Sequence, residues 1–115
     1  MAIPSGGGSE VLKRHYIHAN SDAWAVLING VASHLYTVIS VVANDQGNAA
    51  ESINLRVVID GSGQDIQLMQ SQSLPANGTF VWNEKIVLQG TDHLEAYNSA
   101  GNVDWYVSYI DQDWT

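Results

Sequence analysis

Cysteine is absent from the 115 residues, so the chain has no disulfide, no thiolate zinc site and no cysteine nucleophile. Basic residues are scarce: four lysines and arginines stand against twelve acidic residues, which gives a formal net charge of −8. Nucleic acid and anionic membrane surfaces are bound by clustered basic side chains. We therefore expect neither a nucleic-acid nor a membrane partner.

Long apolar runs are also missing. The longest, over residues 38–43, is interrupted by Ser40 and is far shorter than the ~20 residues of a membrane-spanning helix. The first residues lack the basic start and apolar segment of a signal peptide. Hydrophobic residues make up 45% of the chain and charged residues 14%, which excludes a typical disordered composition. The length then predicts one acidic, soluble domain.

Apolar residues recur with a period of two, and no segment keeps the helical spacing i, i+3, i+4, i+7 together with caps. Over residues 52–60 every second side chain is Ile, Leu or Val, which predicts a half-buried strand. Residues 35–43 are more continuously apolar and predict a central strand covered on both faces. The chain is therefore expected to be all-β.

Turn residues divide the chain at short intervals. Asn29-Gly30 favours a tight hairpin, because both residues tolerate positive φ, and residues 75–78 favour another reversal. Nine strands follow, and many short strands predict a β-sandwich or barrel. They are expected at Glu10–His18, Ala23–Ile28, Leu35–Ala43, Ser52–Asp60, Asp65–Gln70, Thr79–Trp82, Lys85–Leu88, Leu94–Tyr97 and Val103–Ile110.

The two ends and the last third of the chain resemble small virion proteins of tailed bacteriophages. The opening stretch is IPSGGGSEVLKR (3–14), the closing stretch is YIDQDW (109–114), and LPANGT (74–79) and LQGTDHL (88–94) lie between them. The last two are similar to the turn-and-strand pattern of jelly-roll domains in capsid-decoration and tail-accessory proteins. The similarity covers most of the chain, through terminal segments and turn patterns rather than a chemical signature.

This resemblance implies a single antiparallel, jelly-roll-like β-sandwich that assembles on the virion after synthesis in the host cytoplasm. Its first implied role is a capsid decoration or cement protein that forms a homo-oligomer, a trimer by analogy, on the major capsid protein. The alternative is a tail, neck or baseplate accessory protein. The expected domain spans residues 10–115, and a flexible Gly-rich arm spans residues 1–9.

No catalytic, cofactor or metal site is expected. The chain lacks a Gly-x-Ser-x-Gly elbow, and an enzyme is the least favoured class. Histidines 15 and 18 would point to opposite faces of a strand, and all four histidines are expected at the surface or in turns. His93 could contact a cation together with Asp92 and Glu95 if the loop curls. Asp111 and Asp113 share a face of an extended tail, but two ligands are too few for a cation site.

Aromatic residues are numerous for so small a domain. Trp105 and Tyr109 fall on the apolar side of the last strand, so we expect them in the core. Tyr106 falls on the opposite side, which suits an interface or a ligand-binding platform. Exposed aromatics on a β-sandwich leave a carbohydrate-binding module as a further alternative. Trp114 should dock either on its own sheet or on a neighbour.

The N-terminal arm supplies two more candidate contacts. Ile3 and Pro4 are its natural anchors, and the three glycines at 6–8 would let the backbone lie close to a partner. The candidate assembly contacts are therefore Ile3, Pro4, Tyr106 and Trp114.

Overall fold

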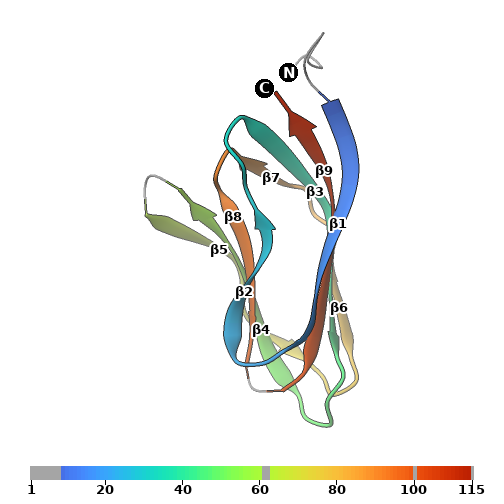
Figure 1. Cartoon of the computed structure of the whole chain (residues 1–115). Helices are drawn as coiled ribbons and strands as arrows, with labels where there is room; N and C mark the ends of the chain where they lie inside the picture. The colour runs from blue at the N-terminus through green and yellow to red at the C-terminus, as the bar shows by residue number, and fades with distance from the viewer. Residues whose placement is uncertain (1–8, 61–62, 100, 115) are drawn as a thin grey trace.

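Figure 1 shows the computed structural model, in which two β-sheets pack face to face. The structure describes residues 9–60, 63–99 and 101–114, and every regular element in these ranges is a strand. The all-β prediction is confirmed, and each expected strand is present. The strands are β1 (Ser9–Asn20), β2 (Ala23–Asn29), β3 (His34–Asp45), β4 (Glu51–Ile59), β5 (Gln64–Leu74), β6 (Thr79–Trp82), β7 (Ile86–Gln89), β8 (His93–Asn98) and β9 (Val103–Asp113).

The strand order is that of a jelly roll. One sheet, called sheet A here, has the order β1-β9-β3-β6, and β7 also pairs with β3; the other, sheet B, has the order β2-β8-β4-β5. β6 pairs with residues 41–44 of β3 and β7 with residues 35–38, so the two form one interrupted strand. Counted together they give eight antiparallel strands in two four-stranded sheets, as in a double Greek key. The β-sandwich prediction is confirmed.

The core lies between the sheets and is almost entirely aliphatic. Trp105 of β9 is its largest fully buried side chain, and its indole nitrogen donates a hydrogen bond to the Oδ1 of Asn98, 3.2 Å away. Asn98 is also fully buried, and its amide donates to the carbonyl oxygens of Asn20 and Ser99. Because its polar atoms are bonded, this asparagine can lie in the core without a large desolvation cost.

The hairpin expected at Asn29-Gly30 is wrong. β2 belongs to sheet B and β3 to sheet A, so the chain crosses between sheets here instead of folding back. Neither residue has a positive φ. Gly30 is needed for a different reason: its N–H donates to the carbonyl oxygen of Asp92 at 3.0 Å, and a Cβ at this position would lie 2.1 Å from the carbonyl oxygen of Gly90.

Several strands extend further than the sequence predicts, and the extensions of β5 and β9 change the expected picture most. β5 continues to Leu74, and β9 continues to Asp113, so the expected C-terminal tail is part of sheet A. β3 is central in sheet A as expected, but only its core-facing side is fully buried; the other side is half-buried. None of the described segments is a helix that could cross a membrane.

Candidate assembly surface

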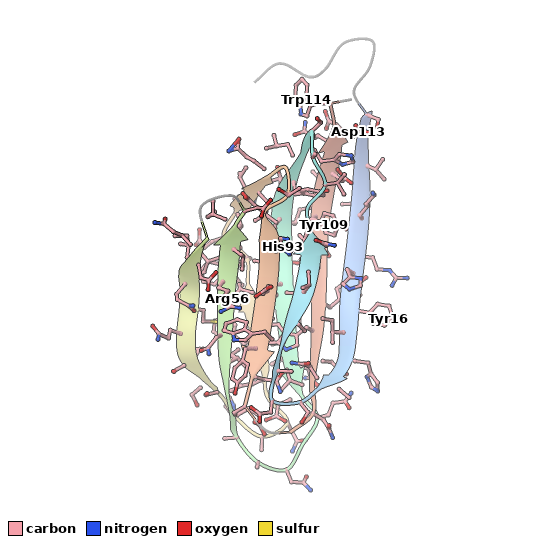
Figure 2. All side chains as sticks on the ribbon, turned by 60° about the vertical axis from the view of Figure 1, so that its left-hand side comes forward. Tyr16, Arg56, His93, Tyr109, Asp113 and Trp114 are labelled. Atoms are coloured by element: carbon pink, nitrogen blue, oxygen red, sulfur yellow. The ribbon has the colours of Figure 1, made fainter. Side chains whose placement is uncertain are left out.

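An apolar row crosses the outer face of sheet A, on the side away from the core. Tyr16 of β1 pairs with Tyr106 of β9, Tyr106 pairs with Val42 of β3, and Val42 pairs with Val81 of β6. Alternation places these side chains opposite the buried Trp105 and Val41. Figure 2 shows Tyr16 projecting away from the body of the sandwich. The row therefore presents two aromatic rings and two valines to the outside.

A second row runs parallel to the first. It joins Leu12 of β1, Ile110 of β9, Thr37 of β3 and Val87 of β7 through the same strand pairings. Leu12 is 71% exposed and Val87 is 59% exposed. Single exposed apolar side chains are normal, but two rows across one sheet, in which every side chain except Thr37 is aliphatic or aromatic, form a patch of the kind that marks an interaction site. We call the two rows together the apolar face.

Few charges interrupt the apolar face. Between the rows lies Arg14, whose guanidinium carbon is 5.3 Å from the centre of the Tyr16 ring. At one end the Asp104 carboxylate accepts from the His18 Nδ1 at 2.9 Å, and at the other end lies Glu10. One arginine and two carboxylates therefore account for a formal −1 of the chain's −8. The remaining acidic charge lies elsewhere, so this face is where like molecules can approach with least repulsion.

The dimensions of the apolar face suit a small protein interface. Four strands at about 4.8 Å spacing, over residues 104–112 of β9 at about 3.3 Å each, give a flat area of about 600 Å². Two such faces together would bury about 1,200 Å², the lower bound of a standard interface. Hollows of about 240 Å³ and 270 Å³ flank Tyr106, the first beside Tyr16 and the second beside Leu12. Tyr106 therefore lies near the middle of the apolar face, between two hollows.

The structure places the four predicted contacts differently. Tyr106 lies on the apolar face and is 44% exposed. Trp114 lies just after β9; its backbone N–H donates to the carbonyl oxygen of Ser33 at 2.9 Å, while its side chain is 39% exposed. Its backbone is therefore fixed to its own sheet and its ring is partly available to a partner. Ile3 and Pro4 lie outside the described residues, as does most of the predicted arm.

An ion-pair cluster holds β1, β9 and β3 together near one end of sheet A. The buried Asp111 carboxylate accepts from Lys13 Nζ at 2.8 Å and lies 2.7 Å from His34 Nδ1. Asp113 lies 3.6 Å from the other nitrogen of the same imidazole. The prediction that all four histidines are at the surface or in turns is therefore wrong for His34, which is mostly buried in β3. The two carboxylates face Lys13 and His34 rather than an open cation position.

The cluster shifts the pKa values of its members. Burial acts to raise the pKa of Asp111, but the hydrogen bonds from Lys13 and His34 outweigh burial and the pKa is lowered. The hydrogen bond to Asp111 raises the pKa of Lys13 against a smaller opposing effect of burial. Both groups are therefore held in their charged forms.

The outer face of sheet B is built differently. The Arg56 guanidinium lies 3.7 Å from the centre of the Trp24 ring, 2.7 Å from Glu95 and 3.4 Å from Asp65. These residues come from β4, β2, β8 and β5, so one side chain links every strand of the sheet. Tyr97 packs 5.3 Å from Trp24. We call this group the Arg56 cluster; its polar groups bind one another.

His93, Asp92 and Glu95 are not arranged as a group that could hold a cation. The Asp92 carboxylate instead accepts from backbone N–H groups of its own and a neighbouring turn, and Glu95 binds Arg56. Among residues 9–60, 63–99 and 101–114, no group of three or more His, Cys, Asp or Glu side chains is arranged so that it could hold a metal ion.

Of the comparisons with known proteins, only the one with solved structures finds a likeness. No protein-family description and no curated protein matches the sequence. Among solved structures, a chain from the disulfide-linked pili of Bacillus endospore appendages superposes with a TM-score of 0.56 at 9% identity, covering 98% of this chain and 95% of that one. This chain has the same fold as that pilus protein.

Proteins of a virus particle share the fold as well. A chain of the infectious bursal disease virus Gx strain superposes with a TM-score of 0.56 at 11% identity over 95% of this chain. A mutant VP2 protein in T=1 particles of the same virus gives a TM-score of 0.54, also at 11% identity and over 95% of this chain. The chain spans about a third of the length of these viral proteins (34% and 32%). At such identities the likeness shows the fold alone.

Most of the apolar face was not anticipated from the sequence. In β1 both alternating sets contain apolar residues, Leu12 and Tyr16 in one and Val11 and Ile17 in the other, so periodicity does not say which set faces out. The valines of β6 and β7 lie in strands too short to show a period. Only Tyr106 carried a usable signal, because its neighbours at 104 and 108 are polar.

Proposed function

We propose that this chain is a non-enzymatic structural subunit of a virion that associates with copies of itself through the apolar face. The observation that carries the proposal is the pair of apolar rows on an otherwise acidic molecule. The jelly-roll fold, shared with proteins of a virus particle and of a pilus, supports a role in assembly. The resemblance of the chain ends to phage virion proteins favours a capsid decoration or cement protein over a tail, neck or baseplate component.

Self-association would be non-covalent. The pili of the Bacillus neighbour are disulfide-linked, but this chain has no cysteine with which to form such a link. Burial of apolar surface is the remaining main driving force, at about 25 cal/mol per Å² of apolar area before the costs of association. A sheet face that meets itself gives a two-fold contact, whereas the trimer expected by analogy needs two different surfaces on each copy. The number of copies is therefore part of the test.

The first experiment measures assembly of the full chain by sedimentation velocity over a concentration series. We expect a reversible oligomer, and Tyr106→Ser should weaken its association at least tenfold, because Tyr106 is the central residue of the face. Leu12→Ser should act in the same direction. Ile66→Ser is the matched control, since Ile66 is 45% exposed but lies on β5 of sheet B. A strictly monomeric wild type at tens of micromolar would contradict self-association.

The second experiment separates the capsid role from the tail role. Purified chain is incubated with capsid and tail fractions of the virus that encodes it, and bound protein is quantified. A cement protein binds capsids and raises their resistance to heat, while an accessory protein binds tails. Trp114→Ala should lower occupancy with less than about 1 kcal/mol loss of subunit stability, because its ring is partly exposed. Deletion of residues 1–9 tests the arm that contains Ile3 and Pro4. Binding to neither fraction would overturn the virion role.

A further inference from the structure

A cleft of about 390 Å³ opens between the two sheets, on the side where β2 lies next to β1. This volume falls in the range of about 300–1,000 Å³ that is usual for small-molecule sites. Figure 2 labels His93 of β8 and Tyr109 of β9 close together at the level where β2 ends. The cleft is lined by His15, Asn29, His93 and Tyr109, with Val26, Leu27 and Ile28 as its apolar part.

The polar groups of the cleft have unused hydrogen-bonding capacity. Two of the four histidines, His18 and His34, are paired with aspartates at 2.9 Å and 2.7 Å. The other two, His15 and His93, form no hydrogen bond or ion pair through their rings within the described residues, and both line the cleft. The Tyr109 hydroxyl is also without such a partner there. Its pKa is raised by burial, so the phenol keeps its proton and remains a donor.

The cleft contains no charged side chain of the kinds that bind ions. No carboxylate, lysine or arginine lines it, although the chain has twelve acidic residues. The charges nearest to Tyr109 are Lys13 and Asp111, which neutralise each other at 2.8 Å. An anion would need an unpaired cation in the wall, and a cation would need a carboxylate. A neutral ligand fits this wall best.

Imidazole, carboxamide and phenol groups each donate and accept hydrogen bonds. Their natural complement is a ligand rich in hydroxyl groups, which also do both, and the apolar wall suits the C–H face of a sugar ring. We propose that this cleft binds a neutral carbohydrate, with His15, Asn29, His93 and Tyr109 as its hydrogen-bonding residues. The site is separate from the apolar face, so it does not depend on the proposed assembly role. It would give a structural subunit the added ability to attach to a glycan.

The test is a titration of the full chain with glucose, galactose, mannose and N-acetylglucosamine. Saturation-transfer NMR detects the bound sugar, and two-dimensional NMR detects the shifted protein signals. We expect at least one sugar to bind in the millimolar range and to shift the signals of β2 residues 26–29. Tyr109→Phe removes one hydroxyl and His15→Ala one imidazole, and each should weaken binding roughly three- to tenfold. Circular dichroism and thermal melting confirm that both variants fold.

Matched controls lie close by on the same strands. His18→Ala removes the other histidine of β1, and Tyr106→Phe removes a hydroxyl from the outer side of β9; both should bind sugar like the wild type. The proposal is wrong if no tested sugar shows binding at a final concentration of about 20 mM, at which a ligand with a millimolar dissociation constant would still be detected. It is also wrong if the controls lose binding equally, or if inorganic phosphate binds the cleft more tightly than every sugar.

Discussion

The outer faces of the two sheets of this jelly roll differ in how their exposed side chains are partnered. Each sheet buries one side in the core and must present the other to the surroundings. Sheet B crosses its strands with the Arg56 cluster, in which charge, aromatic ring and carboxylates satisfy one another. Sheet A instead carries two apolar rows with almost no cross-strand ion pairs on the outside. A face whose groups are satisfied internally has little to offer a partner, whereas an unsatisfied apolar face gains free energy when covered.

The largest expected effect comes from breaking the Arg56 cluster. Arg56→Ala should lower the free energy of unfolding by about 2 kcal/mol, because it leaves the mostly buried Glu95 unpaired and removes the stacking contact with Trp24. Self-association should be unchanged. Arg14→Ala is the control on the other sheet. Arg14 also lies over an aromatic ring, that of Tyr16, but on an exposed strand, so we expect its removal to lower the free energy of unfolding by less than about 0.5 kcal/mol. Urea unfolding at low protein concentration measures both; equal losses would contradict the distinction between the faces.

A smaller effect is expected from the cluster that fixes β1 on the inner side of sheet A. Asp111→Asn should cost about 1.5 kcal/mol of unfolding free energy at neutral pH, because a charge-assisted pair is replaced by neutral hydrogen bonds. The lowered pKa of Asp111 means that its contribution is present above the unfolded pKa and is lost as pH falls through the folded value. Wild type and variant should therefore converge in urea titrations once the pH lies below the lowered, folded-state pKa of Asp111. A difference that persists there would assign the cost to packing.

The raised pKa of Lys13 gives the opposite dependence at high pH. Its contribution is complete below the unfolded pKa and is lost as pH rises through the folded value. Because this lysine is nearly half exposed, solvent weakens its share. The alkaline loss in the same titrations should accordingly be smaller than the acid loss.

The smallest expected effect is that of the net negative charge, most of which lies outside the apolar face, on self-association. Copies with a net charge of −8 repel one another even when their contact surfaces are nearly neutral. Raising sodium chloride from about 0.05 M to about 0.3 M shortens the screening length and should strengthen self-association a few-fold. Sedimentation at both salt concentrations measures this. Weaker association at high salt would show that ion pairs, rather than apolar rows, join the copies.

The strands were largely predictable from sequence because each depends on a local period. The alternation around Ile53 and Leu55 and the turn at Pro75 are visible without any tertiary contact. The error at Asn29-Gly30 arose because a dipeptide suited to a hairpin is used here for close backbone approach during a sheet crossing, which depends on residues 90 and 92. The pairing of His34 with Asp111 joins β3 to β9, and no sequence pattern near either residue predicts it.

The candidate sites were less predictable than the fold. Tyr106 was correctly placed on the outside by its polar neighbours, but its partners in the row come from three other strands. The Arg56 cluster likewise unites four strands, and the cleft collects side chains from β1, β2, β8 and β9. Such surfaces are set by strand order, and strand order in a jelly roll follows from long connections that leave no local pattern.

The pairing of β1 with β9 also determines when the domain can be completed during synthesis. Ser9 lies opposite Asp113, so the first strand of this domain to be synthesised gains its neighbour in the sheet only after the last strand of the domain has followed. Until then Leu12 and Tyr16 belong to an unpaired strand that can join the same strand of another nascent chain. Folding should be slow for so small a domain, because its decisive contacts are distant in sequence. Misassembly is consequently most favoured on polysomes, where several nascent chains lie close together. Lowering the expression temperature or the translation rate should therefore raise the yield of soluble protein.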